Sequence, residues 1–423
     1  MNNTKNVPEI RFKGCYDEDG NWVAFTHPWE QRKVLDLLIQ PITDGPHETP
    51  KLVEKGVPFI SVDAIVDNKI DFNRKRGNIS EEYDELCCKK YKPQFHDVYL
   101  VKSGSTVGKV AIVETTDRFN IWSPLAAMRC GEKTYPYFLY DLLQTKDLQA
   151  QVADKASNGT QPNLSMRELE KFPVSVPSNL EEQKKIGDYF RSLDHLITLH
   201  QRKANAYKKL KKGMLQKLLN QVLRFKADDG SDFPDWEEKK LGDVFKISTE
   251  TNGDKYSKRD VLSVSDEYGI VNQIKLQGRS FAGNDISKYK VVKTGQLVYT
   301  RSPLAVKPFG IIKIVGEEIG IVSPLYIVND VRENNCSKFW YYNFDTPERT
   351  NDYLKPLVRM GAKHTMNISN EEWLSGKVMV PCFAEQQKIA DYFSSLDNVI
   401  ESEKVTASVL KKFKKGMLQK MFV

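Results

Sequence analysis

An internal repeat constrains this chain more than any other feature of its sequence. When the sequence is shifted by 203 positions, residues 182–220 align without a gap on residues 385–423, and 21 of the 39 aligned positions are identical. The longest identical run, Lys211–Lys217, returns as Lys414–Lys420. One structural unit therefore occurs twice, and we expect a pseudo-twofold internal repeat.

Shorter matches extend the repeat toward the start of each half. Arg11–Lys13 matches Arg224–Lys226, and Trp29-Glu30 matches Trp236-Glu237, whereas the sequences between these anchors diverge almost completely. The chain therefore alternates a variable block with a shared segment. We predict two variable domains alternating with two shared helices, with the bounds 1–178, 179–220, 221–384 and 385–423.

The shared segments have the periodicity of long helices with one apolar seam. One row of residues recurs every seven positions, and a second row follows three positions later. In the first copy these rows are Ile186, Leu193, His200, Tyr207 and Met214, with Tyr189, Leu196 and Leu210. In the second copy they are Ile389, Leu396, Glu403, Leu410 and Met417, with Tyr392, Val399 and Phe413.

A single long helix with one apolar stripe is poorly stable in water because most helical stability comes from packing of that stripe. Two copies in one chain favour two long antiparallel helices that form a coiled coil and separate the two variable domains. The alternative is two unrelated surface helices, each on its own core.

The variable blocks predict a mixed α/β (α+β) fold. Short runs rich in β-branched residues and bounded by Gly, Pro or Asp indicate strands. The expected strands are Phe59–Val62, Val98–Lys102, Lys109–Val113, Phe172–Val176, Val261–Val264, Gln296–Arg301, Gly310–Val315 and Lys377–Val380. Helical stretches are expected over Tyr135–Ala153 and Ser337–Tyr353.

The net charge of +7 is concentrated in the shared segments. Residues 182–217 carry ten Lys or Arg against three acids, and residues 385–423 carry seven Lys against five acids. These lysines either solvate an exposed helix face or meet a partner subunit or a nucleic-acid backbone. Six cysteines without C-x-x-C spacing, and no run of 18 apolar residues, predict a soluble, cytoplasmic protein.

Catalytic motifs are missing from the sequence. There is no G-x-x-x-x-G-K-[ST] loop, no G-x-G-x-x-G, no H-E-x-x-H and no G-x-S-x-G. The segment Ser103–Lys109 only faintly resembles a phosphate-binding loop. We therefore predict a protein that is not an enzyme and binds no metal or cofactor of its own.

The order of the blocks and one motif resemble a known family. The motif is Pro177 followed by Glu182–Phe190, repeated as Pro381 followed by Glu385–Phe393. It is similar to the P-x-x-E-Q-x-x-I signature that opens each conserved helix in specificity (S, HsdS) subunits of type I restriction-modification systems. The resemblance covers essentially the whole chain in order and spacing.

The resemblance implies two target-recognition domains, each reading one half of a bipartite asymmetric DNA sequence. It also implies that the paired helices dock two modification (methyltransferase) subunits and through them restriction (translocase/nuclease) subunits, in defence against foreign DNA. S-adenosylmethionine, ATP and Mg²⁺ are then expected on the partner subunits. The alternatives are an orphan or anti-restriction relative, a coiled-coil scaffold that does not bind DNA, and a self-contained methyltransferase or nuclease that the missing motifs oppose.

Polar, turn-rich loops are the candidate DNA contacts, because base edges are read by side-chain hydrogen bonds and phosphates by cations and backbone N–H groups. In the first block the candidates are Asp44, His47, Thr49, Lys102, Ser103, Ser105, Thr106, Lys109, Thr160, Gln161 and Asn163. In the second block they are Arg301, Ser302, Lys363 and His364, with Arg301 the expected guanine contact. Structural turns are the alternative for each loop, and Asn163 also precedes a possible N-cap serine.

The resemblance assigns partner binding to the start of each shared helix. The residues concerned are Glu182, Gln183, Ile186, Tyr189, Phe190, Glu385, Gln386, Ile389, Tyr392 and Phe393.

Overall fold

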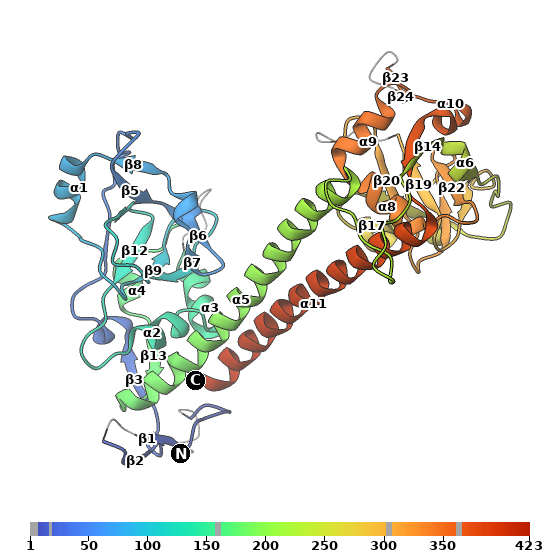
Figure 1. Cartoon of the computed structure of the whole chain (residues 1–423). Coiled ribbons are helices and arrows are strands. Elements are labelled where there is room, and N and C mark those ends of the chain that lie inside the picture. The colour runs from blue at the N-terminus through green and yellow to red at the C-terminus, as the bar shows by residue number, and fades with distance from the viewer. Residues whose placement is uncertain (1–6, 17–18, 157–161, 302–306, 361–365) are drawn as a thin grey trace. The chain divides into compact units, whose positions relative to one another are not determined.

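The computed structural model describes residues 7–16, 19–156, 162–301, 307–360 and 366–423. The chain divides into two compact units (Figure 1). Unit 1 consists of Met1–Gln201 and Lys404–Val423, and unit 2 consists of Arg202–Glu403. This division cuts across both long helices, whereas the expected boundaries follow the sequence blocks, so each unit holds one variable block and a part of each helix.

Unit 1 is built on two small sheets. A four-stranded antiparallel sheet has the order β10-β9-β12-β4, and a three-stranded mixed sheet has the order β11-β5-β8. The strands are β1 (Gly14–Tyr16), β2 (Trp22–Ala24), β3 (Glu30–Lys33), β4 (Thr43–Asp44), β5 (Val57–Ile60), β6 (Ile65–Val66), β7 (Lys69–Ile70), β8 (Gly77–Ile79), β9 (Val98–Val101), β10 (Val110–Ile112), β11 (Asn120–Ile121), β12 (Leu125–Met128) and β13 (Pro173–Val176). The α-helices before the shared segment are α1 (Glu81–Cys88), α2 (Pro136–Leu142), α3 (Lys146–Lys155) and α4 (Met166–Glu170).

Unit 2 repeats the four-stranded antiparallel sheet, with the order β15-β22-β19-β20. Its strands are β14 (Glu237–Lys240), β15 (Phe245–Ile247), β16 (Leu262–Ser265), β17 (Gly269–Asn272), β18 (Lys290–Val292), β19 (Leu297–Thr300), β20 (Ile311–Ile314), β21 (Gly320–Val322), β22 (Ile327–Val331), β23 (Arg359–Met360), β24 (Met366–Asn367) and β25 (Lys377–Val380). Its shorter α-helices are α6 (Leu241–Val244), α7 (Gln273–Gln277), α8 (Ser337–Asp345), α9 (Pro347–Leu354) and α10 (Asn370–Ser375).

The mixed α/β prediction is confirmed, and all eight expected strands are present with ends at most two residues away. Each expected helical stretch is broken once. Thr145 ends the first part of one stretch and caps α3, because its hydroxyl accepts a hydrogen bond from the N–H of Leu148. Pro347 begins α9 in the other stretch, where its missing N–H costs nothing.

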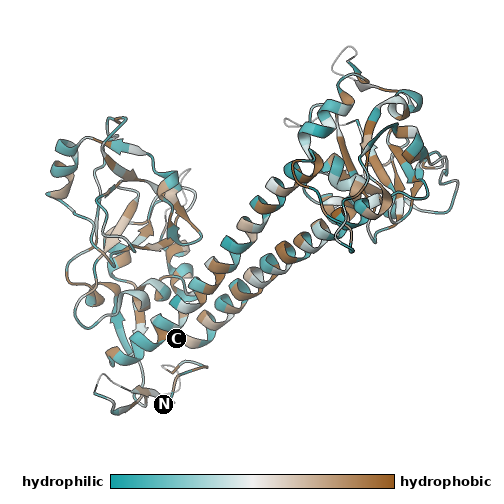
Figure 2. Cartoon of the chain, in the orientation of Figure 1, coloured by the Kyte–Doolittle hydropathy of each residue, from teal (hydrophilic) through white to brown (hydrophobic). Residues whose placement is uncertain are grey.

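The two shared segments form the long helices α5 (Leu180–Leu219) and α11 (Phe383–Met421), which pack together. In unit 1 the start of α5 shares a core with the end of α11, and in unit 2 the end of α5 shares a core with the start of α11. The helices are therefore antiparallel, as predicted. Figure 2 shows apolar positions recurring along both helices between polar ones.

The seam itself differs from the prediction in one respect: the buried second row follows the first by four positions rather than three. Its members in α5 are Phe190, Ile197, Ala204, Lys211 and Leu218, and in α11 they are Phe393, Ile400, Ala407, Lys414 and Met421. The expected row is instead surface-exposed at Leu196 and Leu210, which are 41% and 46% exposed. Residues three and four positions apart both neighbour the first row on a helix, so spacing alone does not choose between them.

One lysine of the seam in each unit forms an ion pair between the helices. The Nζ of Lys414 lies 2.6 Å from a carboxylate oxygen of Asp194 in unit 1, and the Nζ of Lys211 lies 2.6 Å from Asp397 in unit 2. The two pairs are equivalent in the repeat, because Lys211 corresponds to Lys414 and Asp194 corresponds to Asp397. A charged pair within an apolar seam disfavours other registers, because a shifted helix would bury an unpaired charge.

A carboxylate at the start of α5 ties unit 1 to the beginning of the chain. Both oxygens of Glu182 accept hydrogen bonds from the Arg11 guanidinium, at 2.7 and 2.8 Å, and the indole N–H of Trp29 donates to the same carboxylate at 3.1 Å. Phe12 packs edge-on against Tyr189. Glu182 is 1% exposed, so the carboxylate of this charge pair is buried and both of its oxygens are hydrogen-bonded.

Unit 2 contains the same arrangement at the start of α11. The carboxylate of Glu385 accepts from Arg224 at 3.1 and 2.8 Å and from the indole N–H of Trp236 at 3.0 Å. The rings of Phe225 and Tyr392 are in contact, with centroids 5.5 Å apart. The scattered sequence anchors therefore form one three-dimensional motif, the Arg–Trp–Glu cluster, which occurs once in each unit.

The end of α11 completes the core of unit 1. The ring of Phe422 stacks on Phe138 with centroids 5.2 Å apart and lies edge-on to Trp29. The backbone N–H of Ile10 donates to the carbonyl of Lys420 at 2.8 Å. Both ends of the described chain thus lie in unit 1, as Figure 1 shows.

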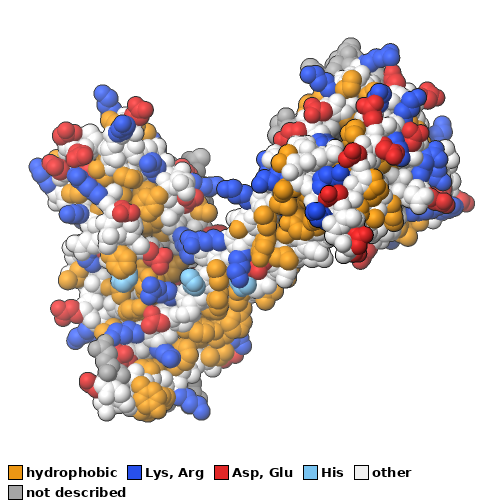
Figure 3. All heavy atoms as spheres, viewed as in Figure 1, with side chains coloured by type: hydrophobic (Ala, Val, Ile, Leu, Met, Phe, Trp, Pro, Cys, Tyr) orange, Lys and Arg blue, Asp and Glu red, His pale blue; other side chains and the backbone are white. Residues whose placement is uncertain are grey.

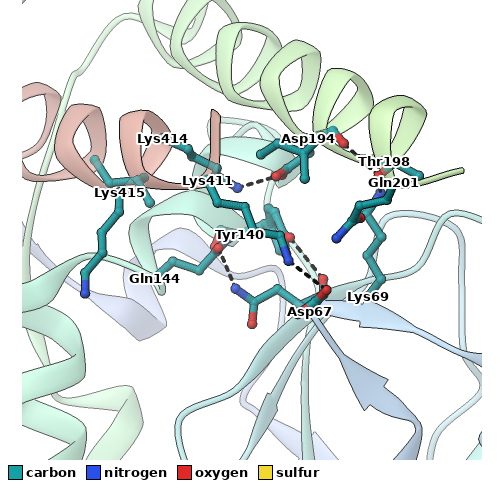
Figure 4. Close-up of a pocket in the computed structure, with 13 residues that line it drawn as sticks. Asp67, Lys69, Tyr140, Gln144, Asp194, Thr198, Gln201, Lys411, Lys414 and Lys415 are labelled. Carbon is teal, nitrogen blue, oxygen red and sulfur yellow. Dashed lines mark hydrogen bonds and ion pairs between the residues drawn. The ribbon is translucent and has the colours of Figure 1, made fainter. Parts of the chain in front are cut away.

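The β6–β7 hairpin of unit 1 reaches the helix pair and closes one side of a cavity of about 390 Å³ (Figure 4). Its turn residues Asp67 and Asn68 have φ angles of 49° and 58°. Lys411 of α11 donates to Asp67 at 3.0 Å and lowers the pKa of that carboxyl, while Lys69 donates to Thr198 of α5 at 2.7 Å. These contacts fix the variable domain of unit 1 to its part of both helices.

Candidate nucleic-acid interface

Segment 122–124 of unit 1 joins two of the predicted loops. The indole N–H of Trp122 donates to the carbonyl of Glu48 at 3.2 Å, and the N–H of Ser123 donates to the carbonyl of Pro46 at 3.2 Å. The carbonyl of Pro124 accepts from the N–H of Lys102 at 2.8 Å. The loop 43–50 and the loop 102–109 therefore meet at one edge of the unit.

The third predicted loop joins the same edge at Asn163. Ser103 and Asn163 form an isolated antiparallel β-bridge, and the N–H of Gly104 donates to the carbonyl of Pro162 at 2.9 Å. Gly108 has a φ of +95°, and a side chain there would meet Gln149 at 2.5 Å. The structure thus brings together loops that are more than fifty residues apart in the sequence.

A buried carboxylate lies at the centre of this edge. Asp44 is 0% exposed, and its oxygens face the ammonium groups of Lys90 and Lys102 and the imidazole of His47. Lys102 lies 3.3 Å from Asp44, and its side chain is only 11% exposed. This placement favours a structural role for Lys102 over the phosphate contact expected from the sequence, whereas His47 and Lys90 extend from the same carboxylate into solvent.

The other described candidates of the first block are distributed around this cluster. Thr49, Ser105, Lys109 and Asn163 are exposed, and Ser103 and Thr106 are half-buried. The Nζ of Lys109 points back to the carbonyl of Ile65, at 3.4 Å. The hydroxyl of Thr106 is buried without a hydrogen-bond partner.

In unit 2, Arg301 follows β19 as Lys102 follows β9 in unit 1. Its Nη2 donates to the carbonyl of Ile368 at 2.8 Å, beside the end of β24. Its Nε is buried without a partner, so this guanidinium retains an unused donor. Burial and the charge of Arg301 lower the pKa of Lys290. Arg301 therefore joins the end of β19 to the residue that follows β24.

The remaining candidates lie outside the described residues. They are Thr160, Gln161, Ser302, Lys363 and His364.

The predicted partner-binding residues are mostly buried within the chain. Glu182 and Glu385 belong to the Arg–Trp–Glu clusters. Gln183 accepts from the N–H of Tyr135 at 3.0 Å and donates to the carbonyl of its own Pro177, and Gln386 makes equivalent bonds in unit 2. The apolar members Ile186, Phe190, Ile389 and Phe393 fill the two cores, and Tyr189 and Tyr392 are half-buried.

The predicted partner-binding residues therefore make contacts within the chain, and these contacts fasten each variable block to the start of a helix. Their contact with a partner stays a prediction. The sequence contained a signal for these intramolecular contacts, because the Arg and Trp of each cluster belong to the short matches that extend the repeat.

Sequence reasoning missed two features of the unit 1 edge. One is Lys90, which binds the buried Asp44. The other is a run of three exposed cations, Arg74–Arg76, beside Trp122. The run itself was the available signal, since three consecutive cations in a short segment bounded by Gly77 indicate a solvent-facing loop.

No group of three or more His, Cys, Asp or Glu side chains among the described residues is arranged to hold a metal ion. Among the helices of the same residues, none combines the length and the apolar character needed to cross a membrane.

A family model matches both halves of the chain. The model for the type I restriction modification DNA specificity domain matches residues 29–209 and 234–412. The two matches include most of each variable block and most of both long helices. The chain therefore belongs to this family and carries two copies of its domain.

Curated relatives have the same description. The chain is 26% identical over 420 residues to a putative type I restriction enzyme MjaX specificity subunit of Methanocaldococcus jannaschii, with 92% of each chain covered. It is 25% identical over 362 residues to the MjaVIII specificity subunit of the same organism, with 81% of this chain and 82% of that one covered.

Solved structures share the fold. The S subunit of a type I restriction-modification system from M. genitalium matches with a TM-score of 0.60 at 14% identity, over 99% of both chains. A chain from a structural study of complex assembly and conformational transition of the type I system matches with a TM-score of 0.51 at 15% identity, over 94% of this chain and 98% of that one.

Proposed function

We propose that this chain reads DNA for a type I restriction-modification complex, with each variable domain recognising one half of a bipartite, asymmetric target. The observation that carries the proposal is the pair of specificity domains whose corresponding loop edges differ. Where unit 1 has Lys102 beside the buried Asp44, unit 2 has Arg301 with an unused Nε donor. Different hydrogen-bond donors with different surroundings at equivalent strand ends support two different half-sites.

The exposed apolar row of the helices is the proposed docking surface for modification subunits. It consists of Leu196 and Phe413 in unit 1 and of Val399 and Leu210 in unit 2, all between 38% and 48% exposed. In the repeat Leu196 corresponds to Val399, and Leu210 corresponds to Phe413. The chain therefore carries the same surface twice. Figure 3 shows hydrophobic side chains at the surface along the helices. Two equivalent surfaces support two modification subunits, through which restriction subunits join.

The chain itself is proposed to be non-catalytic. S-adenosylmethionine would bind to the modification subunits, and ATP and Mg²⁺ would act in the complex with restriction subunits. The chain would contribute recognition and geometry, and the variable blocks would change specificity without altering the partner surface.

Methylation by the reconstituted complex tests this function. We expect no methyl transfer by the purified chain alone, and methylation of a split sequence when its modification subunit is added, measured by genome-wide methylation sequencing of a host that carries only this system. Methyl transfer by the chain alone would support a self-contained enzyme. A complex that binds DNA but never becomes active would support the orphan or anti-restriction alternative, and no DNA binding at all would support a scaffold.

Neighbouring residues of α5 test the docking surface. Leu196→Asp together with Phe413→Asp should remove one of two modification subunits and change stability little, because both side chains are already exposed. Ile197→Ala should instead cost about 2–5 kcal/mol of stability, because Ile197 is buried in the seam. Stoichiometry by native mass spectrometry and unfolding by urea separate the two effects.

The matched control for that experiment is Leu86→Asp, since Leu86 is 55% exposed on α1 of the same unit. It should retain both modification subunits. If the paired substitutions at Leu196 and Phe413 also retained both, the exposed row would not be the docking surface.

A further inference from the structure

The end of the three-stranded sheet in unit 1 holds an arginine in a fixed position. The N–H of Arg76 donates to the carbonyl of Phe59 at 2.9 Å, and the N–H of Trp122 donates to the carbonyl of Ile60 at 2.9 Å. Arg76 precedes β8 and Trp122 follows β11, and these strands flank β5 on opposite sides. The two residues therefore meet across the end of β5.

The side chains of this pair stack. The guanidinium carbon of Arg76 lies 4.0 Å from the centre of the Trp122 indole, which is within the range of a cation–π contact. Trp122 is itself held by its hydrogen bond to Glu48 and by packing against the small core of β5 and β8. The ring thus restricts an otherwise flexible side chain before any ligand arrives, which reduces the entropy lost on binding.

The donors of this guanidinium are unused. Among the hydrogen bonds and ion pairs of the described residues, none involves the Arg76 side chain, although it is exposed. Its neighbours Arg74 and Lys75 are also exposed, and the carboxylate nearest to Arg74, that of Asp71, lies 3.9 Å away. Arg74 thus forms a long ion pair with Asp71, whereas the described residues show no ion pair of Lys75 or Arg76, so this run of cations keeps an excess of positive charge.

The position of the pair connects it to the candidate interface. Trp122 begins segment 122–124, which hydrogen-bonds to loop 43–50 and to Lys102. Arg76 therefore lies at the same edge as His47 and the other candidates, although no motif of the sequence placed it there.

We propose that Arg76, oriented by Trp122 and assisted by Arg74 and Lys75, binds a backbone phosphate of the DNA half-site read by unit 1. A planar guanidinium with free donors matches the geometry of a phosphate, and a run of cations suits the regular charge of a DNA strand better than the edge of one base. This inference rests on the proposed function, and it adds a contact outside all of the predicted loops.

The complex of this chain with its modification subunit provides the test, with duplex DNA as the probe. Arg76→Ala should weaken binding to specific and unrelated duplexes alike and lower the slope of log affinity against log salt by about one unit. Raising the salt from 50 to 200 mM should weaken DNA binding by both complexes. The fold loss of affinity should be about threefold smaller for the variant than for the unsubstituted complex. Arg76→Lys should keep the salt slope but bind more weakly, because a lysine lacks the stacked planar fork.

The matched control is Arg32→Ala. Arg32 is also an exposed arginine of unit 1, on β3, which pairs with β13 rather than with segment 122–124. It should leave affinity and slope unchanged. An unchanged salt slope in Arg76→Ala would overturn the phosphate contact, as would a methylation motif that becomes degenerate at one base. Failure of the unsubstituted complex to bind DNA would overturn the proposed function as well, so the two failures are distinguishable.

Discussion

Replacing Glu182 with alanine is expected to destabilise unit 1 by about 3–5 kcal/mol, the largest stability effect of any single substitution considered for this chain. The carboxylate is 1% exposed and satisfies the Arg11 guanidinium and the Trp29 indole together. Without it, a mostly buried cation and a buried N–H lose their shared partner. Glu182→Gln keeps the shape and one acceptor, so its cost should be lower, about 1–3 kcal/mol.

The two-unit organisation determines how this should be measured. A chain with two compact units need not unfold in one step, so hydrogen exchange of each unit is more informative than a single midpoint. Glu182→Ala should lower protection in unit 1, and Glu385→Ala should do the same in unit 2. The second effect should be smaller, because the Arg224 side chain is more exposed than that of Arg11, at 23% against 13%.

Glu181→Ala is the control for this prediction. Glu181 is adjacent and also acidic, but its side chain is 29% exposed and pairs with Lys184. Surface pairs of this kind contribute less than about 1 kcal/mol. If Glu182→Ala were no more damaging than Glu181→Ala, the Arg–Trp–Glu cluster would not be what fastens the variable block to α5.

Lengthening both helices by one turn is expected to change the gap in the DNA target while leaving both half-sites unchanged. Four residues inserted after Leu199 and four after Ser402 add about 6 Å to each helix at 1.5 Å per residue. Along B-form DNA, at about 3.4 Å per base pair, this corresponds to one or two additional spacer pairs. The physical reason is that α5 and α11 each contribute residues to both compact units.

The insertion positions avoid both interhelical ion pairs. Asp194–Lys414 and Lys211–Asp397 remain within their own units, so each part of the seam keeps its register. Four residues exceed one helical turn only slightly, so the seam should re-form with a modest rotation. The methylation motif of the variant, read genome-wide, is the measurement. An insertion in α5 alone should impair assembly, and an active double insertion with the original spacer would mean that the helices do not set the distance.

The helix pair shows how far periodicity can predict structure. Each helix sequence contains three rows of mostly apolar residues that recur every seven positions. Heptad spacing correctly predicted that the first row lies in the seam. It could not choose between Leu196 and Ile197 for the second row, because residues three and four positions on are both neighbours on a helix surface. Packing buried Ile197 and left Leu196 at the surface.

The candidate interface shows the opposite limit. Loop chemistry identified Asp44, His47 and Lys102 separately, but only the fold placed the carboxylate of Asp44 against the side chains of His47 and Lys102. Once Asp44 is buried, the charge of Lys102 is compensated and its side chain has little surface to offer. Arg76 went unnoticed because the ring on which it stacks, that of Trp122, is 46 positions away in the sequence.

The sequence by itself determined the repeat, the two long helices, the mixed α/β blocks and the family, because these follow from local periodicity and from motifs that occur twice. Only the tertiary structure decided which residues the side chains of the signature contact. Glu182 and Gln183 were expected to contact a partner, yet they bind Arg11, Trp29 and Tyr135 of their own chain. A buried carboxylate needs hydrogen-bond donors, and the fold can supply them from any part of the chain. The spacing of residues in the sequence does not predict a contact between positions 171 residues apart.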